Sequence, residues 1–189
     1  MKKKLAVIFP GIGYHKDKPL LYYATKLAAN RGYEIINIEY HDMPKGIKGD
    51  AGLMKKAVQT AFAQTEEQLT GVDFSEYGNI LFIGKSIGTV ALARYASDHG
   101  IDSKQVWYTP VEATFLFGSK NVMAFIGDDD TWSDVAAVKR LSFENDIKLY
   151  SYPGCDHSLE SELVDRNIAI LRDVMHITEY FIDERGLVR

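Results

Sequence analysis

Residues 79–96, NILFIGKSIGTVALARYA, decide the fold of this chain. The apolar run 80–83 predicts a buried strand, and the small-residue turn after it opens directly into a helix. This turn, residues 84–88, has the pattern G-x-S-x-G, which between a strand and a helix bends so sharply that the serine side chain is pushed outward. Ser86 is therefore predicted to lie beside the unpaired N–H groups of a helix start, where negative charge is stabilised.

Two other interpretations of this stretch remain to be weighed. The run from Gly78 to Ser86 nearly matches the phosphate-binding pattern G-x-x-x-x-G-K-[ST], but five residues instead of four separate the two glycines. Those residues are mostly strand-like, so no loop is left to wrap a phosphate. In the second interpretation the glycines only permit close helix packing, and Ser86 caps the helix. The stretch alone does not exclude this second interpretation.

The composition limits the class of protein. The 189 residues, of which 46% are apolar and 25% charged, fit one domain that spans residues 1–189 and has a sizeable core. The net charge is −4, and the basic residues are scattered apart from Lys2 to Lys4. Because this leaves no basic surface, we expect neither nucleic acid nor a membrane as a partner.

The first residues and the cysteine content indicate a compartment. The start, MKKKLAVIFPG, imitates a signal peptide, but its apolar run 5–9 is shorter than the usual hydrophobic region and fits a first strand better. No apolar run approaches membrane-spanning length, and the single cysteine, Cys155, cannot form an internal disulfide. We therefore expect a soluble protein in the reducing cytoplasm.

Strand-like and helix-like segments alternate along the chain. Mostly apolar strands that alternate with helices are typical of a parallel sheet buried on both faces. We therefore predict an α/β fold: one three-layer, doubly wound domain with a mostly parallel sheet of about six strands. The predicted strands are 5–9, 33–38, 80–83, 105–109, 122–126 and 147–151, and the last two helices are placed at 133–145 and from about residue 159.

Ligands of such sheets bind beyond the carboxyl ends of the strands, so functional residues are expected in the segments that follow the strands. The first strand is followed by PGIGY, residues 10–14. A dinucleotide-binding fold also places G-x-G there, with an acid such as Glu39 after the second strand. Lys16, however, stands where the third glycine of that fingerprint belongs.

Two further loops carry acids and a histidine. The fifth strand is followed by GDDDTW, residues 127–132, which lacks the regular alternation of an EF-hand loop and is otherwise a plain acidic turn. The sixth is followed by YPGCDHS, residues 152–158, where a loop can lean back over the sheet. Serine, acid and histidine thus occur in the order Ser86, acidic loop, His157, which is the chain order of the α/β-hydrolase triad.

With these motifs the chain resembles a small, capless α/β-hydrolase, similar to compact bacterial hydrolases of the dienelactone-hydrolase-like kind. The resemblance covers nearly the whole chain. It rests on residues 84–88 as the nucleophile elbow, 127–130 as the acid turn, 154–158 as the histidine loop, and 10–13 as the turn that supplies one oxyanion-hole N–H. The family usually has His-Gly where this chain has Pro-Gly, and a true dienelactone hydrolase carries cysteine in place of Ser86.

The resemblance implies a serine hydrolase that cleaves a small carboxylic ester or thioester through an acyl-enzyme. Ser86 would be the nucleophile and His157 the general base. Asp130 would hold the histidine, with Asp129 and Glu112 as rival acids. Two alternatives stay open: a non-catalytic binding domain with the same fold, and a hydrolase of small amides or peptides.

The resemblance also implies how the site is completed. The backbone N–H groups of Ile12 and Ile87 would form the oxyanion hole, and no metal or organic cofactor is needed. Only residues 110–121 separate the fourth and fifth strands, too few for a cap. We therefore expect a shallow pocket around the serine, bordered by loops that carry three further side chains: Tyr14, Glu112 and Trp132.

Overall fold

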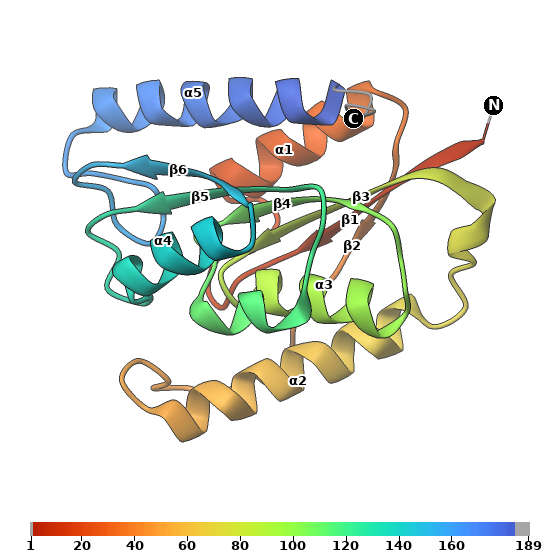
Figure 1. Cartoon of the computed structure of the whole chain (residues 1–189), viewed down its shortest axis with the longest axis horizontal. Coiled ribbons are helices and arrows are strands. Elements are labelled where there is room, and N and C mark those ends of the chain that lie inside the picture. The colour runs from red at the N-terminus through yellow and green to blue at the C-terminus, as the bar shows by residue number, and fades with distance from the viewer. Residues whose placement is uncertain (1, 184–189) are drawn as a thin grey trace.

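The computed structural model describes residues 2–183, which are arranged around one parallel six-stranded sheet (Figure 1). The spatial order of the strands is β2-β1-β3-β4-β5-β6, and every neighbouring pair is parallel. The predicted α/β sheet is thus confirmed. In chain order the strands and helices are β1 Lys3–Phe9, α1 Pro19–Asn30, β2 Glu34–Asn37, α2 Ala51–Leu69, β3 Tyr77–Lys85, α3 Ile87–Asp98, β4 Lys104–Tyr108, β5 Val122–Gly127, α4 Val135–Glu144, β6 Lys148–Tyr152 and α5 Val164–Asp183, with short 3-10 turns η1 Phe74–Glu76 and η2 Glu112–Phe117.

The central strands are buried on both faces, which explains their continuous apolar runs. In β1, Ala6 and Ile8 face one apolar layer, while Leu5, Val7 and Phe9 face the other. The first layer contains the buried side chains of α1 and α5, and the second those of α3 together with one from α4. Figure 1 shows this sandwich, with α1 and α5 above the sheet and α2, α3 and α4 below it.

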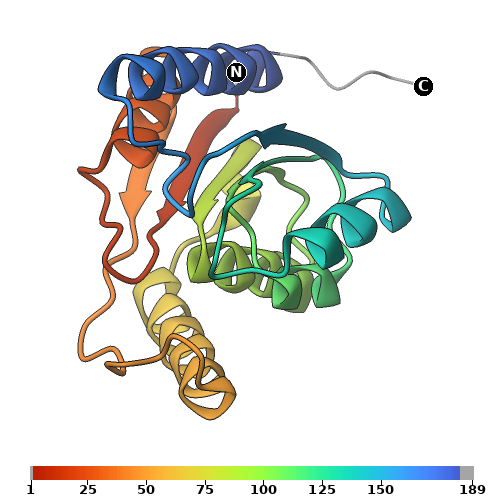
Figure 2. The same cartoon turned by 90° about the vertical axis from the view of Figure 1, so that its left-hand side faces the viewer.

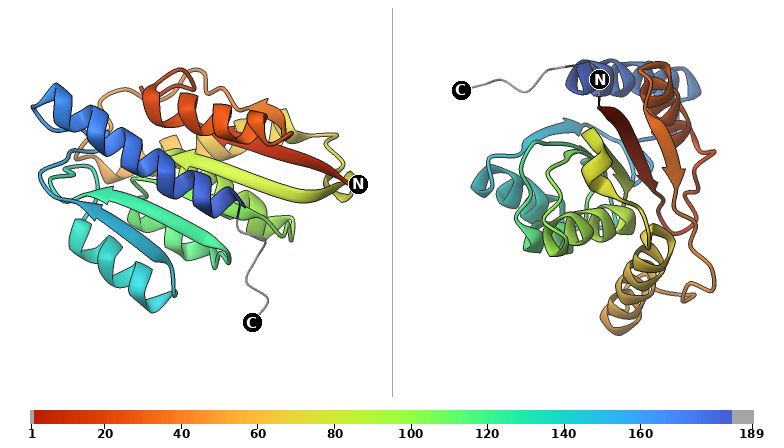
Figure 3. Two further views of the ribbon diagram at one scale, coloured as in Figure 1. Left: turned by 90° about the horizontal axis from the view of Figure 1, so that it is seen from above. Right: turned by 90° about the vertical axis from the view of Figure 1, so that its right-hand side faces the viewer.

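The helices of the first layer are tied together at their C-terminal ends. Seen from above in Figure 3, α5 and α1 both lie over the strands. Arg31, which follows α1, donates to both carboxylate oxygens of Asp183 at 2.5 and 2.6 Å and to Glu179 at 2.8 Å.

Among residues 2–183, no helix combines the length and the apolarity that crossing a bilayer requires.

Two connections differ in detail from the sequence-based expectation. The last helix begins at Val164 instead of near residue 159, because Asn167 accepts hydrogen bonds from the backbone N–H and the hydroxyl of Ser161 and holds the preceding residues in a turn. The link between β4 and β5 contains the 3-10 turn η2 and no α-helix, in agreement with its short length.

All six strands point the same way, so the segments that follow them gather at one edge of the sheet. This carboxyl edge lies at the left of Figure 1 and faces the viewer in Figure 2. The turn after β1, the turn after β3, and the loops after β5 and β6 meet there.

Candidate active site

Ser86 lies on a strained turn between β3 and α3. Its backbone has φ 55° and ψ −123°, a conformation that a residue with a side chain adopts only when its surroundings impose it. The Ser86 N–H donates to the carbonyl oxygen of Tyr108 on β4 at 2.9 Å, which fixes the turn to the neighbouring strand. Ser86 occupies the N-cap position of α3, but its side chain makes no capping hydrogen bond to the helix and is therefore left for other contacts.

Gly88 allows α3 to begin close to the end of β1. A Cβ atom at Gly88 would collide with the carbonyl oxygens of Phe9 and Pro10. The second glycine of the G-x-S-x-G pattern is therefore required by packing between the helix and the turn after β1. That close approach brings Ser86 beside Gly11, whose own Cβ would lie only 3.3 Å from the Cβ of Ser86.

The loop after β6 brings His157 onto the serine. The Nε2 atom of His157 lies 2.7 Å from the Oγ atom of Ser86. The loop can reach this position because it crosses directly over Gly127, where a Cβ atom would collide with the carbonyl oxygen of Cys155. The same carbonyl accepts a hydrogen bond from the N–H of Asp129 at 3.0 Å.

Asp130 is the acid that contacts the histidine. Its side chain is fully buried, and its Oδ2 atom lies 2.6 Å from Nδ1 of His157. The other oxygen, Oδ1, accepts the N–H of Trp132 at 2.8 Å. The rival Glu112 is engaged elsewhere, since its carboxylate accepts the N–H of Asp134 at 2.8 Å.

These contacts set the tautomer of the histidine. An ionised carboxylate can only accept hydrogen bonds, so Nδ1 of His157 carries the hydrogen and Nε2 is left to accept from the hydroxyl of Ser86. Burial lowers the pKa of His157 below its ordinary value of 6.5, although the hydrogen bond to Asp130 opposes this effect, and the positive charge of Lys85 lowers it further. A neutral imidazole next to a serine hydroxyl can accept its proton.

Ile87 directly follows the serine, and Ile12 follows Gly11, whose Cβ atom would lie 3.3 Å from that of Ser86. Ile87 is the first residue of α3, and Ile12 lies in a turn closed by two hydrogen bonds between Gly11 and Tyr14, of 3.1 and 3.3 Å. Both isoleucine side chains belong to one small apolar cluster centred on Ile47. Within the described chain neither N–H has an acceptor, so both are free to donate to a ligand.

The side chains of the loops expected to border the pocket lie at different depths. Tyr14 is buried, its hydroxyl accepts the N–H of Leu20 at the start of α1, and it borders a cavity that Ser158 of the histidine loop also lines. Trp132 does lie at the site, since its ring is 5.9 Å from that of His157 and is 37% exposed. Cys155 is buried, and burial raises the pKa of its thiol, as expected for a passive cysteine.

Sequence reasoning missed two lysines at the site. Lys48, in the loop between β2 and α2, donates to Thr131 at 2.9 Å and lies 5.4 Å from the ring centre of Trp132. Lys85, the residue before the serine, is almost completely buried. Lys85 follows the predicted strand 80–83 and fell within the predicted turn, and because lysine is so rarely buried its position gave no signal. No local pattern pointed to Lys48.

Two small cavities flank the turn after β1. One of about 360 Å³ is bordered by Gly11 and by the side chains of His15 and His41. The other, of about 230 Å³, is mainly apolar and is bordered by Ser158 and Leu159 of the histidine loop. Ligand sites usually have volumes of about 300–1,000 Å³, so the apolar cavity is below this range and the other is at its lower end.

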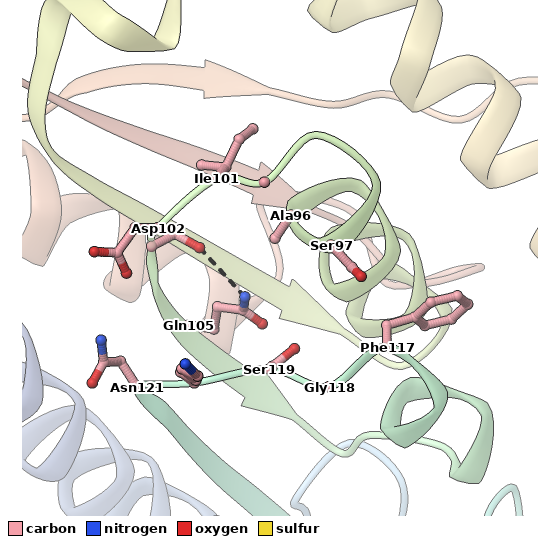
Figure 4. A pocket seen from close by; sticks show the side chains of 12 residues that line it. Ala96, Ser97, Ile101, Asp102, Gln105, Phe117, Gly118, Ser119 and Asn121 are labelled. Atoms are coloured by element: carbon pink, nitrogen blue, oxygen red, sulfur yellow. Dashed lines mark hydrogen bonds between the residues drawn. The ribbon is translucent and has the colours of Figure 1, made fainter.

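A further cavity, of about 600 Å³, lies away from these residues. Figure 4 shows it between the end of α3 and the first residues of β4 and β5, at the amino edge of the sheet. It is lined by Ser97, Gln105 and Ser119, and Gln105 donates to Ser103 at 3.3 Å. Because Ser86 is at the opposite edge, this cavity does not contribute to the site around it.

No group of three or more His, Cys, Asp or Glu side chains in residues 2–183 is arranged to hold a metal ion.

Together, the parallel sheet, the turn at Ser86 and the order of the three side chains define an α/β-hydrolase fold. Solved structures agree with it. The esterase Est1E of Butyrivibrio proteoclasticus, solved with ferulic acid bound, is 14% identical and superposes with a TM-score of 0.68 over 96% of this chain and 88% of its own. The Pyrococcus furiosus esterase Pf2001 is 13% identical, with a TM-score of 0.66 over 96% and 82% of the two chains.

A third similar structure has no lid. It is a serine hydrolase from Xanthomonas campestris, 14% identical, with a TM-score of 0.56 over 94% of this chain and 83% of its own. At such identities the similarity establishes the fold. No protein-family model matches the sequence, and no curated protein matches it either.

Proposed function

We propose that this protein is a serine hydrolase that cleaves a small carboxylic ester or thioester through an acyl-enzyme. The observation that carries the proposal is the continuous line of hydrogen bonds from the Ser86 hydroxyl through His157 to Asp130, at 2.7 and 2.6 Å. The strained backbone of Ser86 supports it, because such strain is usually retained at functional sites. The esterases among the similar structures support it at the level of the fold.

In the first half of the reaction, the Ser86 oxygen attacks the carbonyl carbon of the substrate while Nε2 of His157 takes the serine proton. The carbonyl oxygen becomes negative and accepts hydrogen bonds from the N–H groups of Ile12 and Ile87. Each such donor is typically worth about 2.7 to 4 kcal/mol in the transition state. When the intermediate collapses, His157 returns the proton to the leaving alcohol or thiol, and the acyl group stays on Ser86.

In the second half, water replaces the alcohol. The oxygen of the water attacks the acyl carbon while His157 takes a proton from the water. When the acid leaves, His157 passes that proton to the Ser86 oxygen. Asp130 accepts the hydrogen bond of Nδ1–H throughout, which keeps the tautomer and stabilises the imidazolium. The sum of the two halves is ester plus water giving acid plus alcohol.

Labelling with a fluorophosphonate tests this proposal. We expect one covalent adduct on the wild-type protein, located at Ser86 by mass spectrometry, and none on Ser86→Ala. Ser75→Ala is the matched control, because Ser75 lies in η1, and its hydroxyl bonds to Asp73 instead of a histidine. An unlabelled wild-type protein that also fails to hydrolyse short esters and thioesters would instead indicate a binding domain.

A further inference from the structure

Lys85 is a buried cation for which the mechanism above has no use. It is the last residue of β3, and only 1% of its surface is exposed. Its ammonium donates to the hydroxyl of Thr109 at 2.5 Å and lies 5.0 Å from the ring centre of Tyr14. In the described part of the chain no carboxylate lies within ion-pair distance of it. Burying an ammonium without a counter-ion is unfavourable, so a simple packing role would be served better by methionine.

Both neighbours of the ammonium belong to the frame of the active site. Thr109 directly follows Tyr108, whose carbonyl oxygen accepts the N–H of Ser86. Tyr14 closes the turn that carries Ile12. Lys85 itself also supports that turn, since a Cβ atom at Gly11 would lie 3.2 Å from its carbonyl oxygen and 3.4 Å from its Cγ atom.

The charged groups around Lys85 come from the loops that hold the catalytic side chains. Burial lowers the pKa of Lys85 to about 7, while the carboxylates of Asp130 and Asp156 oppose that effect. In the other direction, the charge of Lys85 lowers the pKa of His157. Tyr14 and Thr109, the remaining polar neighbours, are uncharged at neutral pH, because burial raises the pKa of Tyr14 to about 12. The two groups are also close in the fold, because Lys85 directly precedes Ser86, whose Oγ atom lies 2.7 Å from Nε2 of His157.

We propose that Lys85 is a positioning residue of this active site, which holds the turn of residues 11–14 through Tyr14 and adds a positive charge next to the residues that contact His157. The inference rests on the proposed function, because it gives the same site a further component. At the pH where His157 titrates, Lys85 still carries its proton and disfavours a second positive charge nearby. The histidine therefore stays able to accept the serine proton in more acidic solution.

The experiment compares Lys85→Met with the wild type. Methionine replaces the unbranched apolar stem of lysine, is one heavy atom shorter, and removes the charge. We expect kcat on a short ester to fall about ten-fold with little change in KM, because the oxyanion donor at Ile12 is used only in the transition state. We also expect the acidic limb of the pH profile of kcat/KM to move to higher pH.

Lys4→Met is the matched control. Lys4 also donates to an oxygen, that of Arg31 at 3.1 Å, and lies 5.4 Å from the ring centre of a tyrosine, Tyr33. It stands near the start of β1, at the amino edge of the sheet, so its loss should change neither kcat nor the acidic limb. Far-ultraviolet circular dichroism of each variant establishes that it is folded.

The possible results separate this inference from the proposed function. If the wild type is labelled at Ser86 but Lys85→Met keeps the acidic limb in place, Lys85 has at most a packing role and the inference is wrong. If the wild type is neither labelled nor active, the proposed function itself fails.

Thr109→Val provides the second variant, should Lys85→Met not fold. It removes the one hydrogen-bond acceptor that the ammonium has among residues 2–183 and leaves the lysine in place. An ammonium without that acceptor loses its proton more readily. We then expect the acidic limb to move in the same direction, and an unchanged limb would also contradict the inference.

Discussion

Ser86 has a backbone conformation that costs about 1–3 kcal/mol and persists only because its neighbours impose it. The N–H of Ser86 is bound to β4, and α3 begins directly after it. The result is a hydroxyl aimed at His157 instead of at the helix. At this scale the chemistry depends on single hydrogen bonds, so single substitutions can test them.

The contact between Asp130 and His157 can be tested by Asp130→Asn. An amide at this position donates as well as accepts, so it permits the tautomer in which Nδ1 lacks its hydrogen. We expect kcat to fall by about 10⁴-fold with the fold retained. Asp129→Asn is the control, because the exposed side chain of Asp129 does not contact the histidine and activity should be kept. A collapse in Asp129→Asn and not in Asp130→Asn would move the acid to the neighbouring residue.

The pH dependence should report the lowered pKa of His157. Only the neutral imidazole accepts the serine proton, so activity is lost as the pH falls through the pKa of the histidine. Because burial lowers this pKa, the acidic limb of kcat/KM should have its midpoint below pH 6.5. A pH profile of ester hydrolysis measures this directly. A midpoint above 6.5 would mean that the hydrogen bond to Asp130 outweighs burial.

The loops after β5 and β6 form the next level of organisation. Neither loop holds its side chain in place alone, because the histidine loop is packed against Gly127 at the end of β5. Within the acidic loop, the N–H of Trp132 donates a hydrogen bond to the Asp130 carboxylate and holds it in place. The geometry of acid and base is therefore a property of two loops in contact.

Gly127→Ala tests this contact. The new methyl group would overlap the carbonyl oxygen of Cys155 and push the histidine loop away. We expect the free energy of unfolding to fall by about 1–3 kcal/mol. We also expect kcat to fall even where the variant is fully folded, because His157 moves with the loop. Gly52→Ala in the first turn of α2 is the control: its Cβ would meet only the exposed side chain of Asp50, at 3.3 Å, so stability should change by no more than about 0.5 kcal/mol in either direction and activity should be kept. Urea unfolding and ester hydrolysis measure the two effects.

The whole molecule determines how much substrate the site can cover. The sheet and its two layers of helices form the body, and the short link η2 leaves no α-helix between β4 and β5. The loop before α2 is joined to the acidic loop by the hydrogen bond from Lys48 to Thr131. The cavities beside the turn after β1 have volumes of only about 230 and 360 Å³. A long acyl chain would therefore remain largely in water.

We accordingly expect short acyl substrates to be preferred or at least not disfavoured. Each buried CH₂ contributes about 0.8 kcal/mol, so chain length increases kcat/KM only while the added carbons are covered. A series of p-nitrophenyl esters from acetyl to dodecanoyl measures this. The advantage of a longer chain should end early in the series. A steady rise up to dodecanoyl would require a deep acyl tunnel, contrary to the cavities seen here.

The sequence by itself determined the elements and their class. Apolar runs and helical spacing identify the six strands and most helix positions, because both are periodic over a few neighbouring residues. The G-x-S-x-G turn is equally local, since its glycines and serine lie within one bend. The first residue of α5 was misplaced because Asn167, farther along the chain, holds Ser161 in a turn.

Only the tertiary structure decided which residues meet. Three aspartates stand in a row at 128–130, and their spacing does not say which of them turns inward; the packing of Cys155 over Gly127 sets that direction. The burial of Lys85 beneath Tyr14 likewise depends on a turn far away in the chain. Contacts of this kind depend on the path of the whole chain, because strands that are adjacent in space are separated in sequence by helices and loops.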